Sequence, residues 1–105
     1  MANVIKAEDF VKNVKENEGI AVVDFFATWC GPCNMLAPVF TEVDKEHKDS
    51  AYFAKVDVDE SMELAQEFGV STVPTVVFFK GGKEVSREIG FMPKEKIESI
   101  LAGLK

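Results

Sequence analysis

The stretch that decides the fold is Trp29-Cys30-Gly31-Pro32-Cys33, which holds the only two cysteines of the chain. It follows an apolar run, Ile20-Ala21-Val22-Val23-Asp24-Phe25-Phe26, and it precedes a stretch of helical periodicity. The first turn of a helix carries unpaired N–H groups and the positive end of the helix dipole, and both favour a thiolate. Because the thiolate is the nucleophile of disulfide exchange, the pattern predicts that Cys30 attacks and that Cys33, one turn further on, reaches back to it.

Length and composition limit the classes of protein that need to be considered. The chain has 105 residues, so we expect one domain over residues 1–105. Its net charge is −6. It has no basic block, which disfavours binding to nucleic acid or to an anionic membrane. No apolar run approaches the roughly 20 residues of a membrane span, and the N-terminus does not resemble a secretory signal. We therefore expect a cytoplasmic, monomeric protein whose cysteine pair is catalytic or metal-binding.

The periodicity of the chain predicts the element order βαβαβαββα. Strands are expected at residues 4–5, 20–26, 51–58, 75–79 and 83–89. Helices are expected at residues 7–17, from Pro32 onward, at residues 59–68 and from Pro93 onward. The alternating first part implies parallel strands with right-handed crossovers, and the Gly81-Gly82 turn adds an antiparallel hairpin. The predicted fold class is therefore α/β, a mixed sheet with helices on both faces.

Several side chains have predicted places within these helices. The first helix should bury a stripe formed by Phe10, Val11 and Val14, and Asp59 should cap the third helix, which Gly69 ends. The second helix contains Pro38, which should kink it. Its apolar stripe is expected to comprise Met35, Leu36, Val39, Phe40 and Val43.

Asp24 interrupts the most apolar strand of the chain. A buried carboxylate costs several kcal/mol unless it is paired, and the usual response is a raised pKa. Two interpretations are open: the strand register exposes Asp24 at an edge, or Asp24 is an acid–base group beneath the cysteines that takes the proton of Cys33. Lys55, a charge within the third strand, is either a solvated edge residue or a neighbour of Asp24 that tunes its pKa.

The remaining candidates are weaker on sequence alone. A zinc site usually needs four ligands, and the single histidine, His47, lies about 20 Å along the helix from the cysteines, so no metal site is predicted. His47 itself is expected to be a solvated surface residue. Trp29 is either part of the core or a contact surface for a protein substrate. Because most X–Pro bonds are trans, the residues alone favour a trans Val73–Pro74 bond.

Over nearly its whole length, the chain resembles the thioredoxin family. The matching pieces are Val23-Asp24-Phe25, Trp29-Cys30-Gly31-Pro32-Cys33, Pro38, Lys55-Val56-Asp57-Val58-Asp59, Val73-Pro74-Thr75, Phe79-Lys80-Gly81-Gly82 and Gly90. The resemblance implies a five-stranded mixed sheet flanked by four helices, and an enzyme that reduces protein disulfides through a redox-active Cys30–Cys33 disulfide. It also implies a cis Val73–Pro74 bond. Asn34 and Phe91 depart from residues that are common in the family.

The resemblance also assigns roles and partners. Asp24 and Lys55 match the buried pair that assists proton transfer during catalysis. The substrate groove is expected to use Trp29, Gly31, Pro32, Val73, Pro74, Ile89 and Gly90. The implied partners are a thioredoxin reductase, either NADPH- and flavin-dependent or ferredoxin-linked, and disulfide-containing substrates such as reductases and peroxidases. Those cofactors belong to the reductase, and no cofactor is expected to be bound to this chain.

Two alternatives to a disulfide reductase remain. The first is a thiol oxidase or isomerase of the same fold, which would more often carry a histidine between the cysteines. The Gly31-Pro32 dipeptide offers no imidazolium to stabilise the Cys30 thiolate, which makes the disulfide relatively stronger and favours a reductant. The second is a module that binds a partner protein in the same groove without turnover.

Overall fold

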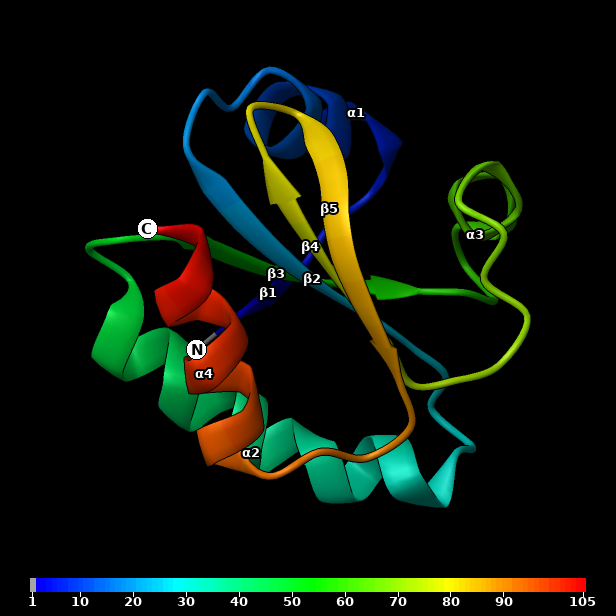
Figure 1. The fold of residues 1–105 in the computed structure, drawn as a ribbon. Coiled ribbons are helices and arrows are strands. Elements are labelled where there is room, and N and C mark those ends of the chain that lie inside the picture. Colours follow the sequence, from blue (N-terminus) through cyan, green and yellow to red (C-terminus); the bar gives the residue numbers. More distant parts are fainter. Residues whose placement is uncertain (1) are drawn as a thin grey trace.

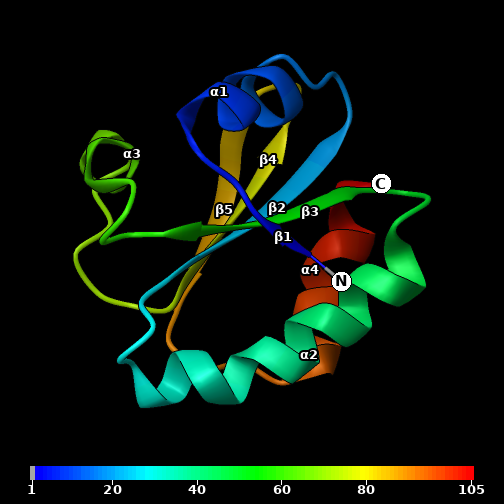
Figure 2. The same ribbon diagram turned by 180° about the vertical axis from the view of Figure 1, so that it is seen from behind.

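The computed structural model describes residues 2–105 as a five-stranded sheet between two layers of helices (Figure 1; Figure 2). The strands are β1 (Asn3–Val4), β2 (Ile20–Phe26), β3 (Tyr52–Asp57), β4 (Thr75–Lys80) and β5 (Lys83–Ile89). The helices are α1 (Ala7–Phe10), which continues into the π-helical segment η1 (Val11–Lys15), α2 (Gly31–His47), α3 (Met62–Glu67) and α4 (Lys94–Leu104). The predicted element order and the α/β fold class are confirmed.

β2 lies at the centre of the sheet, whose strand order is β1-β3-β2-β4-β5. β3 pairs in parallel with both β1 and β2, while β4 pairs antiparallel with β2 and β5. All residues of β2 except Phe26 are buried. A strand that is covered on both faces has no solvent-facing side, which is why its sequence is an almost unbroken apolar run.

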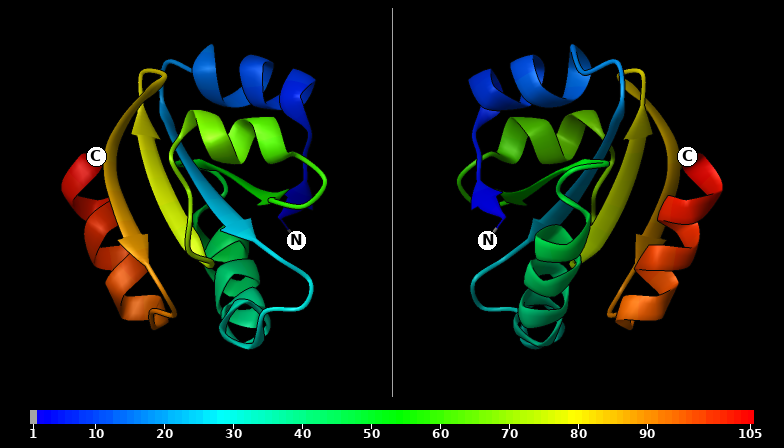
Figure 3. Two further views of the ribbon diagram at one scale, coloured as in Figure 1. Left: turned by 90° about the vertical axis from the view of Figure 1, so that its right-hand side faces the viewer. Right: turned by 90° about the vertical axis from the view of Figure 1, so that its left-hand side faces the viewer.

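Two apolar clusters fill the space on either side of the sheet. α2 and α4 cover one face, and α1, η1 and α3 cover the other (Figure 3). Successive strand residues point to opposite faces, so Val22 packs toward α2 whereas Val23 packs toward α1. On the α1 side, the ring of Phe10 lies 5.2 Å from that of Phe68 and 5.7 Å from that of Phe79, measured between centroids.

The predicted apolar stripes were wrong at two residues, Val11 and Met35, which face solvent. Val11 is 42% exposed and Met35 is 62% exposed. Val11 begins the π-helical segment, in which hydrogen bonds span one more residue and the periodicity of the side chains shifts. The buried positions of α2 are spaced by three and four residues, and Met35 falls between two of them.

The predicted cap of the third helix was also wrong. α3 begins at Met62 with Ser61 at its N-cap, so Asp59 lies in the preceding turn. The carboxylate that closes this turn belongs to Asp57, whose Oδ1 accepts the N–H groups of Asp59 at 2.9 Å and Glu60 at 3.4 Å. Gly69, with φ of 63°, follows α3 as predicted. α2 runs without interruption through Pro38.

The β4–β5 turn supplies a test of backbone packing. Gly81 and Gly82 both have positive φ, but only a Cβ at Gly82 would clash with protein atoms: it would lie 2.2 Å from the Lys15 carbonyl oxygen. We expect Gly82→Ala to lower the free energy of unfolding by several kcal/mol, because the hairpin must separate from η1.

The matched control is Gly81→Ala, which adds the same methyl group to the same turn with no atom within 4 Å. Its cost should be limited to about 1–2 kcal/mol of backbone strain. Urea denaturation of both variants measures the difference, and equal losses would contradict the close approach of Gly82 to Lys15.

Candidate functional site

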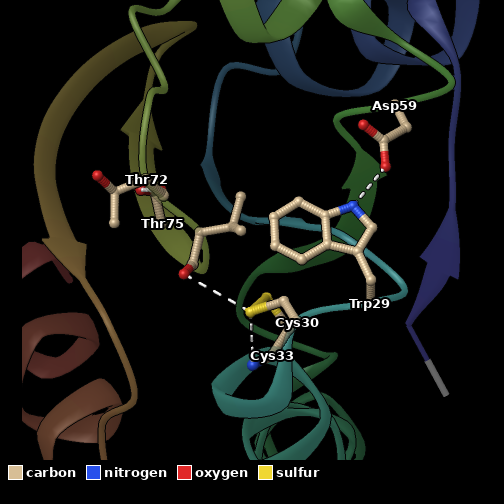
Figure 4. The surroundings of a disulfide bond; sticks show 7 residues. Trp29, Cys30, Cys33, Asp59, Thr72 and Thr75 are labelled. Carbon is tan, nitrogen blue, oxygen red and sulfur yellow. Dashed lines mark hydrogen bonds between the residues drawn. A yellow bond between two sulfur atoms is a disulfide. The ribbon is translucent and has the colours of Figure 1, made fainter.

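The two cysteines lie where the central strand gives way to a helix (Figure 4). Cys30 is the N-cap of α2, with extended backbone angles, and Pro32 occupies the first turn, where a missing N–H costs no helical bond. The N–H of Cys33 donates to Cys30 Sγ at 3.2 Å, and the two residues form a disulfide with their Cα atoms 5.2 Å apart. This confirms the predicted position of both cysteines at the start of a helix.

A groove of about 390 Å³ runs past one of the two cysteines. Cys30 lines it and Cys33 does not, so a molecule in the groove meets Cys30 first. One wall is formed by the start of α2 and the two residues before it, and the other by the loop between α3 and β4. The lining residues are Trp29, Cys30, Gly31, Pro32, Ser71, Thr72 and Val73.

The loop wall is held close to the cysteines. The Val73–Pro74 peptide bond is cis, as the family resemblance implied, and the Val73 carbonyl oxygen lies 3.6 Å from Cys30 Sγ. Pro74 is buried rather than part of the groove surface. The N–H of Gly90 donates to the Pro74 carbonyl at 2.7 Å, so Gly90 lies beside Pro74, but neither Gly90 nor the exposed Ile89 lines the groove.

Three residues of this site were not predicted from the sequence. Asp59 accepts a hydrogen bond from the indole Nε1 of Trp29 at 2.9 Å, which orients a ring that is 72% exposed (Figure 4). Trp29 is thus a surface residue and not part of the core. Ser71 and Thr72 line the groove. Their position directly before Val73 is a signal that could have identified them.

Asp24 lies on the face of the sheet that α2 covers. The strand residue two positions earlier, Val22, packs in one cluster with Leu36 of α2. Cys33 is on the buried side of α2. Asp24 and Cys33 are therefore both buried on the face of the sheet that α2 covers.

The carboxyl group of Asp24 has no exposed surface, and neither of its oxygens has a hydrogen-bond partner among the described residues. Burial disfavours the charged form and raises the pKa of Asp24 from 3.8 to about 7, although the charge of Lys55 acts in the opposite direction. This excludes the interpretation in which Asp24 is exposed at a sheet edge.

Lys55 lies directly opposite Asp24 in the register between β2 and β3. Its ammonium group sits 4.4 Å from the centroid of the Phe26 ring, an arrangement in which the ring face attracts the cation. Within the described residues, no hydrogen bond joins Lys55 to Asp24, so the lysine acts on the carboxyl group through space. Of the two interpretations, the structure supports the one that places Lys55 beside Asp24.

The prediction that His47 is a solvated surface residue was wrong. His47 is partly buried at the end of α2, and its Nε2 lies 2.8 Å from a carboxylate oxygen of Glu98 on α4. Glu46 completes a group of ligand atoms within 4.8 Å of one another. This group lies at the end of α2 opposite to the cysteines.

None of the described helices is long and apolar enough to cross a membrane.

The burial of Asp24 predicts a pH-dependent stability. Because its pKa is higher in the folded state, the free energy of unfolding falls as the pH rises from about 4 to about 7 and is constant above. Asp24→Asn removes this ionisation and should be more stable than the parent above pH 7, by at most about 4 kcal/mol, and similar to it near pH 4.

Denaturant unfolding across this pH range measures the effect. Asp49→Asn is the control, since it makes the same substitution at an aspartate that is exposed. An Asp24→Asn variant that is less stable than the parent at pH 8 would contradict the unpaired, buried carboxyl group.

Comparison with known proteins agrees with this geometry. A sequence profile of the thioredoxin family matches residues 1–103. The chain is 41% identical to thioredoxin from Bacillus subtilis over 98 residues, which cover 93% of this chain and 94% of that protein. It is 48% identical to thioredoxin from Alicyclobacillus acidocaldarius over 81 residues, 77% of each chain.

Solved structures give the same result. The X-ray structure of Fasciola hepatica thioredoxin superimposes with a TM-score of 0.89 at 42% identity, and the match covers 100% of both chains. Family profile, relatives, fold and the Cys30–Cys33 pair all agree. The chain belongs to the thioredoxin family and is a disulfide oxidoreductase with a redox-active cysteine pair.

Proposed function

We propose that the protein reduces protein disulfides in two exchange steps at Cys30 and Cys33. In the first step, the Cys30 thiolate attacks one sulfur of the substrate disulfide, forms a mixed disulfide and releases the other sulfur as a thiolate. In the second, the Cys33 thiolate attacks Cys30 Sγ, releases the second substrate sulfur and leaves the Cys30–Cys33 disulfide. Two electrons pass from the cysteine pair to the substrate, which takes up two protons.

The observation that carries this proposal is the position of Cys30 at the N-cap of α2. Its sulfur accepts the N–H of Cys33, and the groove reaches it directly. An N–H donor and the helix dipole both favour the thiolate over the thiol. Cys33 lies one turn away and does not line the groove, which suits a residue that attacks Cys30 and not the substrate.

Asp24 supplies the proton acceptor that the second step needs. Cys33 must lose its proton before it attacks, and burial leaves few acceptors in its surroundings. A carboxyl group whose pKa is about 7 exchanges its proton near neutral pH, which is the condition for an effective general base. Lys55 would help by stabilising the carboxylate form of Asp24.

The groove would hold an extended segment of the substrate against Val73. Trp29, Gly31 and Pro32 offer an apolar wall, and the exposed Ile89 and the backbone of Gly90 would extend the opposite wall beyond Pro74. Extended peptides bind such walls through backbone hydrogen bonds.

A reductase must restore the dithiol after each turnover. In this proposal, a thioredoxin reductase supplies the electrons from its own NADPH and flavin, or from ferredoxin, and the chain itself carries only the redox-active disulfide. Substrates would be disulfide-containing proteins such as reductases and peroxidases. A protein that must return to the dithiol state belongs in a reducing compartment, so we propose a cytoplasmic location. We also propose that the protein is a monomer.

A binding module that holds a partner without turnover is the second candidate, because the exposed Trp29 is suited to bind a protein surface. Cysteine variants separate the two functions. Cys33→Ser should accumulate a mixed disulfide with a peptide disulfide, Cys30→Ser should form none, and Asp24→Asn should prolong the life of the mixed disulfide at neutral pH several-fold.

Thiol trapping followed by mass spectrometry measures each species over time. Asp49→Asn serves as the control for Asp24→Asn, since it changes the same charge at an exposed position. A Cys30→Ser variant that forms the mixed disulfide as fast as the parent would contradict the assigned nucleophile. If both cysteine variants lose turnover but still bind the peptide, the groove serves both binding and reaction.

A further inference from the structure

Arg87 connects the last strand of the sheet to the end of α3. It lies on β5, an edge strand, opposite Val77, whose side chain packs on the face that α1 and α3 cover. From there, its Nη2 donates to the carbonyl oxygen of Phe68 at 2.7 Å. Phe68 is the C-cap of α3, and a helix end has carbonyl groups without helical partners. A guanidinium therefore satisfies the carbonyl at which the helix stops.

The guanidinium is held in this position by a second contact. Its Nε donates to one carboxylate oxygen of Glu84 at 2.6 Å, and its Nη2 donates to the other at 2.7 Å. Two parallel bonds between a guanidinium and a carboxylate fix both position and orientation, which a single point charge does not do. Glu84 thus orients the guanidinium of Arg87 toward the carbonyl of Phe68.

Phe68 is also the start of the loop that forms one wall of the groove. Its ring is fixed among the rings of Phe10, Phe25 and Phe79. The chain then turns at Gly69 and passes through Ser71, Thr72 and Val73 to the cis bond at Pro74. The direction in which the loop leaves α3 is set at Phe68, where the ring is held by the core and the carbonyl by Arg87.

We propose that Arg87 is a positioning residue for substrate binding: through the Phe68 carbonyl it sets the distance between the Ser71–Val73 wall and Cys30. The inference rests on the proposed function, because it concerns the groove in which the substrate would lie. It assigns Arg87 no contact with the substrate and no part in the chemistry of the sulfurs.

Removal of Arg87 should shift the wall without unfolding it. Other bonds keep the loop in place near its ends: the N–H of Val70 donates to the Ala65 carbonyl at 2.8 Å, the Thr75 hydroxyl donates to the Thr72 carbonyl at 2.6 Å, and the N–H of Gly90 donates to the Pro74 carbonyl. None of these bonds holds the carbonyl of Phe68. A small shift of the wall changes how well an extended substrate fits, but leaves Cys30 at the helix N-terminus unaffected.

The test compares a large and a small disulfide. Reduced protein is mixed with either a cyclic peptide disulfide that has extended, uncharged flanks or with hydroxyethyl disulfide, and oxidation is followed by the fluorescence of Trp29, the only tryptophan. For Arg87→Gln, we expect the half-saturating concentration of the peptide to rise about three- to tenfold while the limiting rate stays within about twofold. The rate with hydroxyethyl disulfide, which is too small to reach the wall, should not change.

Lys80→Gln is the matched control. Lys80 also lies on a strand and donates to a carbonyl at the end of a helix, that of Leu104 at 2.7 Å, but on the opposite side of the sheet from Phe68. Lys80→Gln should change neither the half-saturating concentration of the peptide nor the rate with hydroxyethyl disulfide. Arg87→Lys, which retains a donor for Phe68 but not the paired bonds to Glu84, should fall between the parent and Arg87→Gln.

Hydrogen exchange supplies a second measurement. Faster exchange of the amides of residues 69–73 in Arg87→Gln, with no change in β2, would support a displaced loop. The inference is overturned if the peptide's half-saturating concentration does not change, if Lys80→Gln raises it equally, or if both disulfides slow down together. If the parent protein reduces neither disulfide, the proposed function itself is wrong, and the inference that rests on it fails with it.

Discussion

The hydrogen bond from the N–H of Cys33 to Cys30 Sγ depends on the whole arrangement of the first half of the chain. A buried central strand must end, the chain must turn within four residues, and a helix must begin with Cys30 at its cap. Only then do unpaired N–H groups of a helix meet a sulfur at the surface of a groove. The Gly31-Pro32 dipeptide allows this because proline loses no bond in the first turn.

The same constraint explains the position of the acid. Since successive strand residues point to opposite faces, Asp24 shares with Val22 the face of β2 that α2 covers. A carboxyl group without a hydrogen-bond partner in the described residues lowers the stability of the folded protein, and an apolar residue would pack there more favourably. A buried carboxyl group whose pKa is about 7 suits the proton-acceptor role that we propose for it.

Much of the fold could be predicted from the sequence because its signals are local. The apolar run at 20–26, the Gly81-Gly82 hairpin and the position of the cysteines all depend on neighbours in the chain. The errors arose where packing between distant elements decides the outcome. Met35 and Val11 are apolar but point to solvent, and His47 is paired with Glu98, which is remote in the sequence.

The candidate site shows the same division. Asp24 could be suspected from one charge in an apolar strand, but only the register with β3 shows that Lys55 is its neighbour. The residues alone favoured a trans Val73–Pro74 bond, and the cis bond was expected only from the family resemblance. Asp59, which orients Trp29, and Arg87, which holds Phe68, act across gaps of 30 and 19 residues, and no sequence pattern marks such contacts.

The central claim is that the Cys30–Cys33 pair is a reductant. The most direct measurement is the equilibrium of its disulfide with a series of glutathione redox buffers, followed by Trp29 fluorescence and thiol trapping. A disulfide that persists when most of the glutathione is reduced is the result that the account predicts, because nothing between the cysteines stabilises the Cys30 thiolate as an imidazolium would. A disulfide that is reduced by mildly reducing glutathione would contradict it and would identify an oxidase or isomerase of the same fold.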